Sequence, residues 1–243
     1  MAALEDASGA LSFRTGLAAI QTLFLTLLSA GDHVVCSDVV YGGTVRLLQQ
    51  VLSRFGVSVD FVDTSQPELV QKALQPNTKL IFIETPANPT LKLTDIKAIA
   101  ALAKTVQIPL VVDNTFLTPI GLPVLAYGAD IAVYSTTKYI SGSNTTVGGA
   151  LLCNDTSLLD KLFFVRNTTG CIQAPQEAWL TLQGIKTLPI RFAAHSDNAL
   201  NLVQPLSRQN FFYLVPLLLL LSSLLKLLRD RLVIDLHGFL ILQ

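Results

Sequence analysis

Apolar runs of strand length alternate with longer amphipathic segments along most of the chain. Several runs, such as L-I-F-I-E and P-L-V-V-D, are continuously apolar, which favours strands covered on both faces in a mostly parallel sheet. The predicted strands are His33–Ser37, Ser58–Val62, Lys79–Glu84, Pro109–Asp113, Ile131–Ser135 and Gly149–Cys153. The predicted helices are Gly16–Ser29, Gly43–Arg54, Pro67–Leu74, Thr94–Lys104, Thr156–Arg166, Gln176–Gly184 and Phe192–Leu202. This order predicts an α/β fold with right-handed crossovers and helices on both faces of the sheet.

The sequence is most polar and most distinctive where the predicted strands end. These ends read S-D-V-V-Y-G-G-T (Ser37–Thr44), E-T-P-A-N-P (Glu84–Pro89), V-V-D-N-T (Val111–Thr115) and Y-S-T-T-K-Y (Tyr134–Tyr139). Because ligands bind at the carboxyl ends of the strands in such sheets, we expect the functional site there. The chain has neither G-x-G-x-x-G after a strand nor G-x-x-x-x-G-K-[ST], which argues against a dinucleotide or P-loop site.

Composition narrows the classes of protein further. The 17 Lys and Arg residues balance 17 Asp and Glu residues, which argues against a nucleic-acid binder and against a polybasic membrane-surface protein. The three cysteines and three histidines are scattered, so we expect neither a disulfide framework nor a zinc site or other metal site. The chain begins M-A-A-L-E-D-A-S-G-A without a signal-peptide pattern. We therefore expect a cytoplasmic protein.

Two ionisable residues stand out at the strand ends. Lys138 follows a buried strand and three hydroxyl residues, so a desolvated Lys138 would be a candidate Schiff-base nucleophile. The alternative is an ordinary surface lysine. Asp113 ends an apolar strand, where a buried carboxylate needs a donor or a cation such as a protonated pyridine nitrogen. The alternative for Asp113 is an Asx-turn.

Four further residues indicate a phosphate-bearing, flat ligand. Thr15 is a suitable N-cap, and the N–H groups of Gly16 and Leu17 would then form an anion site at a helix start. Tyr41 lies in a glycine-rich turn, where its ring could stack on a flat ligand. Asn88 lies between two prolines and could orient a ligand through its amide. A capped helix, a turn tyrosine and a turn asparagine are the structural alternatives.

Together these segments closely resemble the pyridoxal-phosphate-dependent trans-sulfuration enzymes of cysteine and methionine metabolism. The matching strings are T-G-L-A-A-I, A-G-D-H-V-V, Y-G-G-T, E-T-P-A-N-P-T, V-V-D-N-T-F, S-T-T-K-Y and G-I-K-T-L-P-I-R. The resemblance extends from about Ala2 to Leu202. It implies the large domain of the fold type I PLP-dependent transferases over residues 1–203, with pyridoxal 5′-phosphate as cofactor.

The resemblance also implies a role for each matching residue. Lys138 would form the Schiff base and move protons, and Asp113 would pair with the pyridine nitrogen. Tyr41 would stack on the ring and take part in proton transfer, and Asn88 would hydrogen-bond the ring 3′-oxygen. The phosphate would be held by the main-chain N–H groups of Gly16 and Leu17 and by the hydroxyls of Ser135 and Thr137.

The implied function is elimination or replacement at a small sulfur-containing amino acid, of the cystathionine γ-lyase or γ-synthase kind. Methionine γ-lyase and O-acylhomoserine sulfhydrylase are alternatives, although Gly43 lies where some methionine γ-lyases carry a cysteine. A catalytically inactive fragment is the alternative from another class. The family's oligomer is a tetramer built from dimers, and we expect neither a nucleic acid nor a membrane as partner.

The chain departs from the family at both ends. The family's N-terminal Tyr-x-Arg motif and the carboxylate-binding arginine of its C-terminal domain have no counterpart here. Residues 204–243 form an apolar tail with its core at Phe211–Leu225, which is shorter than the about 20 residues of a membrane span. An altered reading frame, a docked helix and a membrane anchor are the three interpretations of this tail.

Overall fold

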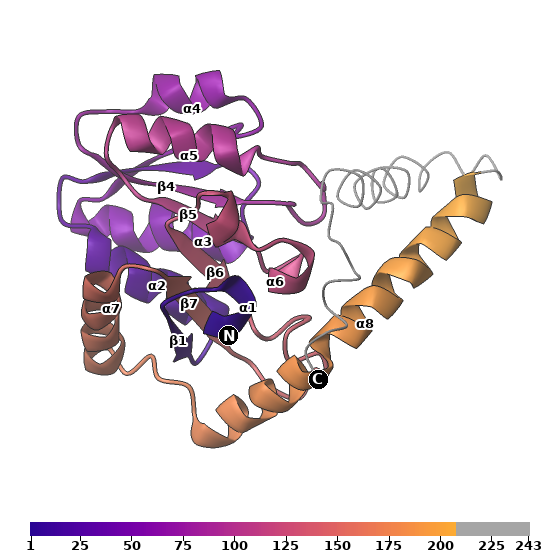
Figure 1. The fold of residues 1–243 in the computed structure, drawn as a ribbon. Helices are drawn as coiled ribbons and strands as arrows, with labels where there is room; N and C mark the ends of the chain where they lie inside the picture. Colours follow the sequence, from indigo (N-terminus) through magenta and orange to yellow (C-terminus); the bar gives the residue numbers. More distant parts are fainter. Residues whose placement is uncertain (208–243) are drawn as a thin grey trace. The chain divides into compact units, whose positions relative to one another are not determined.

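The computed structural model describes residues 1–207 (Figure 1). The chain divides into two units, Met1–Pro189 and Ile190–Gln243. The sheet and all the predicted site residues belong to the first unit. The core of the predicted apolar tail, Phe211–Leu225, lies outside the described residues.

One seven-stranded sheet organises the first unit, with the order β1-β7-β6-β5-β4-β2-β3. Its strands are β1 (Gly9–Phe13), β2 (His33–Ser37), β3 (Ser58–Val62), β4 (Thr78–Glu84), β5 (Leu110–Asp113), β6 (Ile131–Tyr134) and β7 (Gly149–Cys153). The pairs from β6 to β3 are parallel, whereas β7 runs antiparallel to both β6 and β1. The predicted mostly parallel α/β sheet is therefore confirmed.

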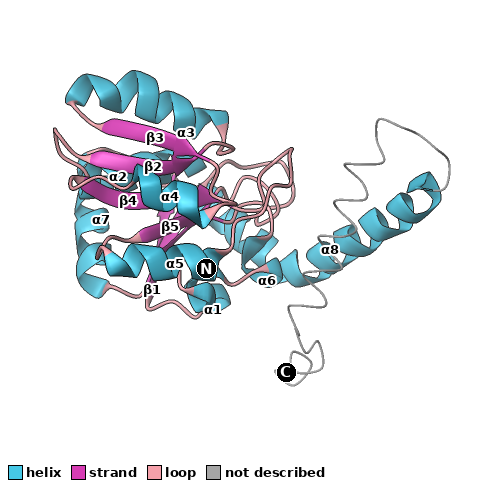
Figure 2. Ribbon diagram, turned by 90° about the horizontal axis from the view of Figure 1, so that it is seen from above, coloured by secondary structure: helices cyan, strands magenta, loops and turns pink. Residues whose placement is uncertain are grey.

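Helices cover both faces of this sheet, as predicted (Figure 2). The helices are α1 (Ala2–Glu5), α2 (Gly16–Leu27), α3 (Gly42–Arg46), α4 (Pro67–Ala73), α5 (Ile96–Thr105), α6 (Thr118–Gly121), α7 (Thr156–Thr168) and α8 (Pro175–Ser207). A π-helical turn, η1 (Leu47–Val51), and a 3₁₀ turn, η2 (Leu52–Phe55), extend α3, and η3 (Val124–Tyr127) precedes β6. Helices α2 and α7 pack together on one face, and α4 and α5 pack together on the other (Figure 1).

Several elements differ from the sequence prediction. The short elements α1, α6 and η3 were not predicted, and the single helix predicted at Gly43–Arg54 is α3 followed by the turns η1 and η2. Strand β1 was not predicted, because its run G-A-L-S-F is short and only Phe13 in it is buried. The two helices predicted at Gln176–Gly184 and Phe192–Leu202 are one continuous helix, α8. Pro189 favours a break because it lacks an N–H group, but a proline removes only one helical hydrogen bond, and a helix can continue through it.

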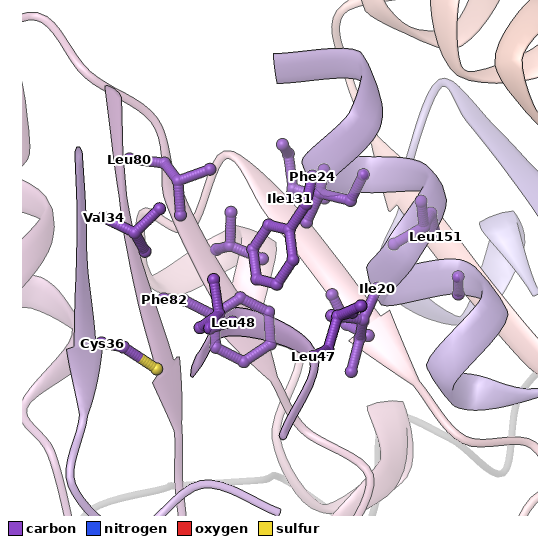
Figure 3. Packing of buried hydrophobic residues seen from close by; sticks show 14 of the residues in the cluster. Ile20, Phe24, Val34, Cys36, Leu47, Leu48, Leu80, Phe82, Ile131 and Leu151 are labelled. Carbon is purple, nitrogen blue, oxygen red and sulfur yellow. The ribbon is translucent and has the colours of Figure 1, made fainter. Parts of the chain in front are cut away.

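The hydrophobic core between the sheet and α2 shows which side chains at the strand ends lie on the α2 face of the sheet (Figure 3). Alternate residues of the central strands, such as Phe82, Val111 and Val133, pack against α2 and the turns after α3. The ring of Phe24 on α2 lies 5.6 Å from that of Phe82, between ring centroids. Because side chains alternate along a strand, the residues two positions further on continue this face. These residues are Glu84, Asp113 and Ser135.

A buried carboxylate ties the first helix to the opposite side of the sheet. Glu5 is 3% exposed and accepts hydrogen bonds from the Tyr134 hydroxyl and from the N–H groups of Val124 (3.3 Å) and Leu125 (3.2 Å). Asn114 donates a further hydrogen bond to the Tyr134 oxygen at 3.0 Å. Glu5 therefore accepts hydrogen bonds from the N–H groups at the start of η3 as well as from the tyrosine hydroxyl.

We expect Glu5→Ala to lower the free energy of unfolding by about 2–4 kcal/mol, because it leaves a buried N–H group, a partly buried N–H group and a buried hydroxyl without their acceptor. Urea unfolding followed by circular dichroism measures this loss. Glu68→Ala, which removes an exposed glutamate on α4, is the control and should change stability by less than about 0.5 kcal/mol. Equal stability of the two variants would contradict the role given to Glu5.

Candidate active site

The carboxyl ends of the parallel strands bring three predicted segments together. Glu84 and Asp113 are register partners at the ends of β4 and β5, and Asp113 is also the register partner of Val133 on β6. Ser135 comes two residues after Val133, and its N–H group donates to the Thr115 hydroxyl at 2.7 Å. The expectation that the polar strand ends meet at one edge is thus confirmed.

Asp113 is a buried carboxyl group at the centre of this edge. Its side chain is 7% exposed, and burial raises its pKa above the ordinary value. The N–H group of Thr115 donates to its Oδ1 at 3.0 Å, which is the Asx-turn contact that the sequence left as an alternative. That contact supplies no positive charge, and no lysine, arginine or histidine in residues 1–207 forms an ion pair with Asp113. A bound cation could therefore form an ion pair with the Asp113 carboxylate.

Glu84 is a second acid at this edge, and the sequence reasoning did not select it as a site residue. Burial and repulsion by Asp113 raise its pKa to about 7. Its Oε2 accepts the N–H group of Tyr41 at 2.7 Å, and the backbone N–H of Asn88 lies close enough to the carboxylate to lower its pKa. The sequence does show an acidic residue at the end of an apolar strand. Its position beside Asp113, however, follows from the register of β4 and β5, which the sequence does not show.

The start of α2 lies against the end of β6. Thr15 caps the helix by accepting the N–H group of Ala18 at 2.8 Å, as predicted. A Cβ atom added to Gly16 would lie 2.9 Å from the Cβ of Ser135, so a side chain at this position would collide with the strand end. The close approach places the first N–H groups of α2 beside the Ser135 hydroxyl. This arrangement is a suitable cradle for an anion.

The two hydroxyl groups predicted to bind phosphate have different surroundings. Ser135 is half-buried, and its main-chain N–H is the group that the Thr115 hydroxyl accepts. The Thr137 hydroxyl donates to the Gly148 carbonyl at 3.2 Å and accepts the Gly148 N–H at 3.0 Å. Since a hydroxyl has one proton, Thr137 could donate to a phosphate only by releasing the Gly148 carbonyl.

Lys138 lies in the turn that follows β6, and its side chain is exposed rather than desolvated. The turn is fixed by main-chain hydrogen bonds from Lys138 to Ser135 and from Gly142 to Lys138. Within the described part of the chain, its ammonium group forms no ion pair with any carboxylate. The amine is therefore available for chemistry.

Tyr41 and Asn88 lie on the two loops next to Glu84. Tyr41 is 58% exposed and precedes α3, and its ring fills the space that a side chain on Gly43 would need, because an added Cβ would collide with the ring. Asn88 is exposed in the loop after β4. The main-chain N–H groups of both residues approach the Glu84 carboxylate at the Asp113 edge. No contact between their side chains and Asp113 is observed among residues 1–207.

Other kinds of site find no support in the part of the chain that the structure covers. Within residues 1–207, histidine, cysteine and acidic side chains form no cluster that could hold a metal ion. No helix in the same range combines the length and the hydropathy needed to cross a membrane.

Comparison with known proteins agrees with these features. The family model for Cys/Met metabolism PLP-dependent enzymes matches residues 1–215. A probable cystathionine gamma-synthase from Herpetosiphon aurantiacus is 48% identical over 204 residues, which are 84% of this chain and 64% of that protein. A cystathionine beta-lyase from Staphylococcus haemolyticus is 45% identical over 203 residues, 84% of this chain and 52% of that protein.

A solved structure extends the similarity to the fold. The cystathionine gamma-lyase from Lactobacillus plantarum, complexed with L-serine, superposes with a TM-score of 0.83 at 41% identity. The match covers 85% of this chain and 54% of that chain. The chain therefore spans between about half and two thirds of the length of these relatives. The three relatives carry three different activity names, so similarity alone does not select one reaction.

Proposed function

Because this chain belongs to the Cys/Met metabolism PLP-dependent enzyme family, we propose that it catalyses elimination or replacement at a small sulfur-containing amino acid, with pyridoxal 5′-phosphate as cofactor. The reaction is of the cystathionine γ-lyase or γ-synthase kind. The observation that carries the proposal is Asp113, a buried carboxyl group without a cation partner among the described residues. It ends the strand next to β6, and the start of α2, which suits a phosphate, lies against Ser135 just after β6.

The residues of the site fit this cofactor in three respects. The ring nitrogen of pyridoxal phosphate, when protonated, supplies the positive charge that Asp113 lacks. The N–H groups of Gly16 and Leu17 at the start of α2 would bind the phosphate, together with the hydroxyls of Ser135 and Thr137. Lys138 offers an amine without an ion pair in the described chain, which suits covalent attachment.

Bound pyridoxal phosphate withdraws electrons from the substrate and so stabilises the negative charge left when the α proton is removed. The Nζ of Lys138 would take this α proton and deliver it further along the substrate. The Asp113 carboxylate would hold the proton on the ring nitrogen. The Tyr41 ring would cover the flat face of the cofactor and assist proton transfer, and the Asn88 side chain would orient the ring oxygen.

The proposal is tested by titrating the purified chain with pyridoxal phosphate and following the visible absorbance band of the attached cofactor. Borohydride reduction and peptide mapping should place the label on Lys138. A panel of cystathionine, methionine and an O-acylhomoserine with a thiol then separates the reactions, since γ-elimination of cystathionine gives 2-oxobutanoate and β-elimination gives pyruvate. A folded chain without label or turnover would instead be the inactive fragment.

We further propose that the chain forms a homo-oligomer built from dimers and works in the cytoplasm. The exposure of both Tyr41 and Lys138 supports a site that a second copy helps to cover. The three cysteines are free thiols, which is typical of a reducing compartment. Sedimentation equilibrium with and without pyridoxal phosphate measures the oligomeric state, and a monomer under both conditions would contradict it.

A further inference from the structure

Glu84 is a partly buried acid for which the proposed chemistry has no use. It ends β4, and its register partner on β5 is Asp113, the residue proposed to pair with the ring nitrogen. A glutamate in this position costs folding free energy unless something satisfies its charge. Its partners therefore indicate what it does.

Other carboxylates near this edge are satisfied by a lysine. The Lys92 ammonium lies 2.8 Å from Asp63 and 3.3 Å from Asp38. Neither Glu84 nor Asp113 has such a cation within residues 1–207. The edge thus presents two neighbouring acids, and one ring nitrogen can supply a cation to only one of them.

The partners of Glu84 are main-chain N–H groups from two separate loops. Its Oε2 accepts the Tyr41 N–H at 2.7 Å, 43 positions away in the sequence, and the Asn88 N–H lies close enough to the carboxylate to lower its pKa. Tyr41 ends the loop between β2 and α3, and Asn88 belongs to the loop after β4. One carboxylate therefore joins the two loops that carry the residues proposed to contact the cofactor ring.

We propose that Glu84 is a positioning residue that holds the Tyr41 and Asn88 loops together beside Asp113 and so shapes the cofactor site. This inference rests on the proposed function for its cofactor part, whereas the joining of the loops belongs to the protein alone. Charge-assisted hydrogen bonds of this kind are about twice as strong as neutral ones, so the ionised carboxylate holds both loops best.

The charge of Glu84 gives the role a dependence on pH. The ionisable groups around it are Asp113 on β5 and the buried Cys36 thiol on β2, whose pKa is raised by its burial and by the charge of Glu84. The pKa of Glu84 itself is raised to about 7. A glutamine at this position resembles the protonated acid, so the wild type and Glu84→Gln should differ mainly above pH 7.

The first measurement is amide hydrogen exchange in the cofactor-free chain. We expect Glu84→Ala to speed the exchange of the Tyr41 amide about 10-fold, because its acceptor is lost, and to speed that of the Asn88 amide by a smaller factor. Glu84→Gln should stay within about threefold of the wild type, since its carbonyl oxygen can still accept the Tyr41 N–H and face the Asn88 N–H. Glu68→Ala, an exposed glutamate on α4, is the matched control and should change neither amide.

The second measurement is the Kd for pyridoxal phosphate across pH. We expect wild type and Glu84→Gln to bind equally at about pH 6 and the wild type to bind about threefold or more tightly at about pH 8. If Glu84 only supported the fold, the ratio of the two Kd values would not change with pH.

Exchange of both amides at the wild-type rate in a folded Glu84→Ala variant would overturn the inference. If that variant does not fold, the inference is tested by the ratio of the Kd values of wild type and Glu84→Gln for pyridoxal phosphate. A ratio that is the same at about pH 6 and about pH 8 would overturn it. A wild type that binds no cofactor overturns the proposed function and the cofactor part of the inference, while the exchange rates still decide whether Glu84 joins the two loops.

Discussion

Lys138→Ala is expected to abolish covalent attachment of pyridoxal phosphate and to lower turnover by at least about 1,000-fold. The substitution removes both the amine that would hold the cofactor and the base that would move the α proton, and each role is large on its own. Reduction with borohydride, followed by mass spectrometry, measures the attachment, and release of the oxo acid measures turnover.

The fold should not change in this variant, because the Lys138 side chain is exposed and forms no ion pair within residues 1–207. The control is Lys161→Ala, which removes an exposed lysine on α7 and should leave attachment and turnover intact. Attachment at another lysine in the Lys138→Ala variant, with turnover preserved, would show that the site lies elsewhere.

Asp113→Asn is expected to lower turnover by at least about 100-fold, which corresponds to the roughly 3 kcal/mol lost when a buried charge loses its partner. Asparagine has nearly the same shape and still accepts the Thr115 N–H group, so the geometry of the turn is kept. It cannot hold a proton on the ring nitrogen. Turnover and the Kd for pyridoxal phosphate measure the effect.

The same substitution should not destabilise the cofactor-free chain. Burial raises the pKa of Asp113, so the folded chain binds more protons than the unfolded chain over the range between the two pKa values. Stability therefore falls as the pH rises through this range, and asparagine removes that loss. At neutral pH the variant should be at least as stable as the wild type, with the difference disappearing near pH 4. Lost turnover accompanied by lower stability would point to a structural role instead.

The strands illustrate what the sequence could predict. His33–Ser37, Ser58–Val62 and Gly149–Cys153 have their predicted bounds, because apolar runs with clear polar or glycine boundaries leave little freedom. Strand β1 escaped prediction because it is formed at the sheet edge by pairing with β7, which local pattern does not reveal. Helix α8 differed from its prediction because Pro189 does not break it.

The site was predictable to the extent that it lies at strand ends. Asp113 was selected because a single buried aspartate ends an apolar run, and its burial is confirmed. Glu84 was missed because its significance depends on three partners from other segments, namely Asp113 and the loops of Tyr41 and Asn88.

The position of β1 in the sheet has a consequence for how the chain is made. Its partner is β7, with Gly9 opposite Cys153 and Phe13 opposite Gly149. At a synthesis rate of about 5–20 residues per second, β1 waits roughly 7–28 s on the ribosome before β7 exists. During that time the first strand has no edge to join, so co-translational folding must begin with the parallel strands β2 to β6. Pairing of β7 with β6 and β1 would then close the sheet, and α7, which follows β7 in the chain, would pack onto α2 and β1 after that.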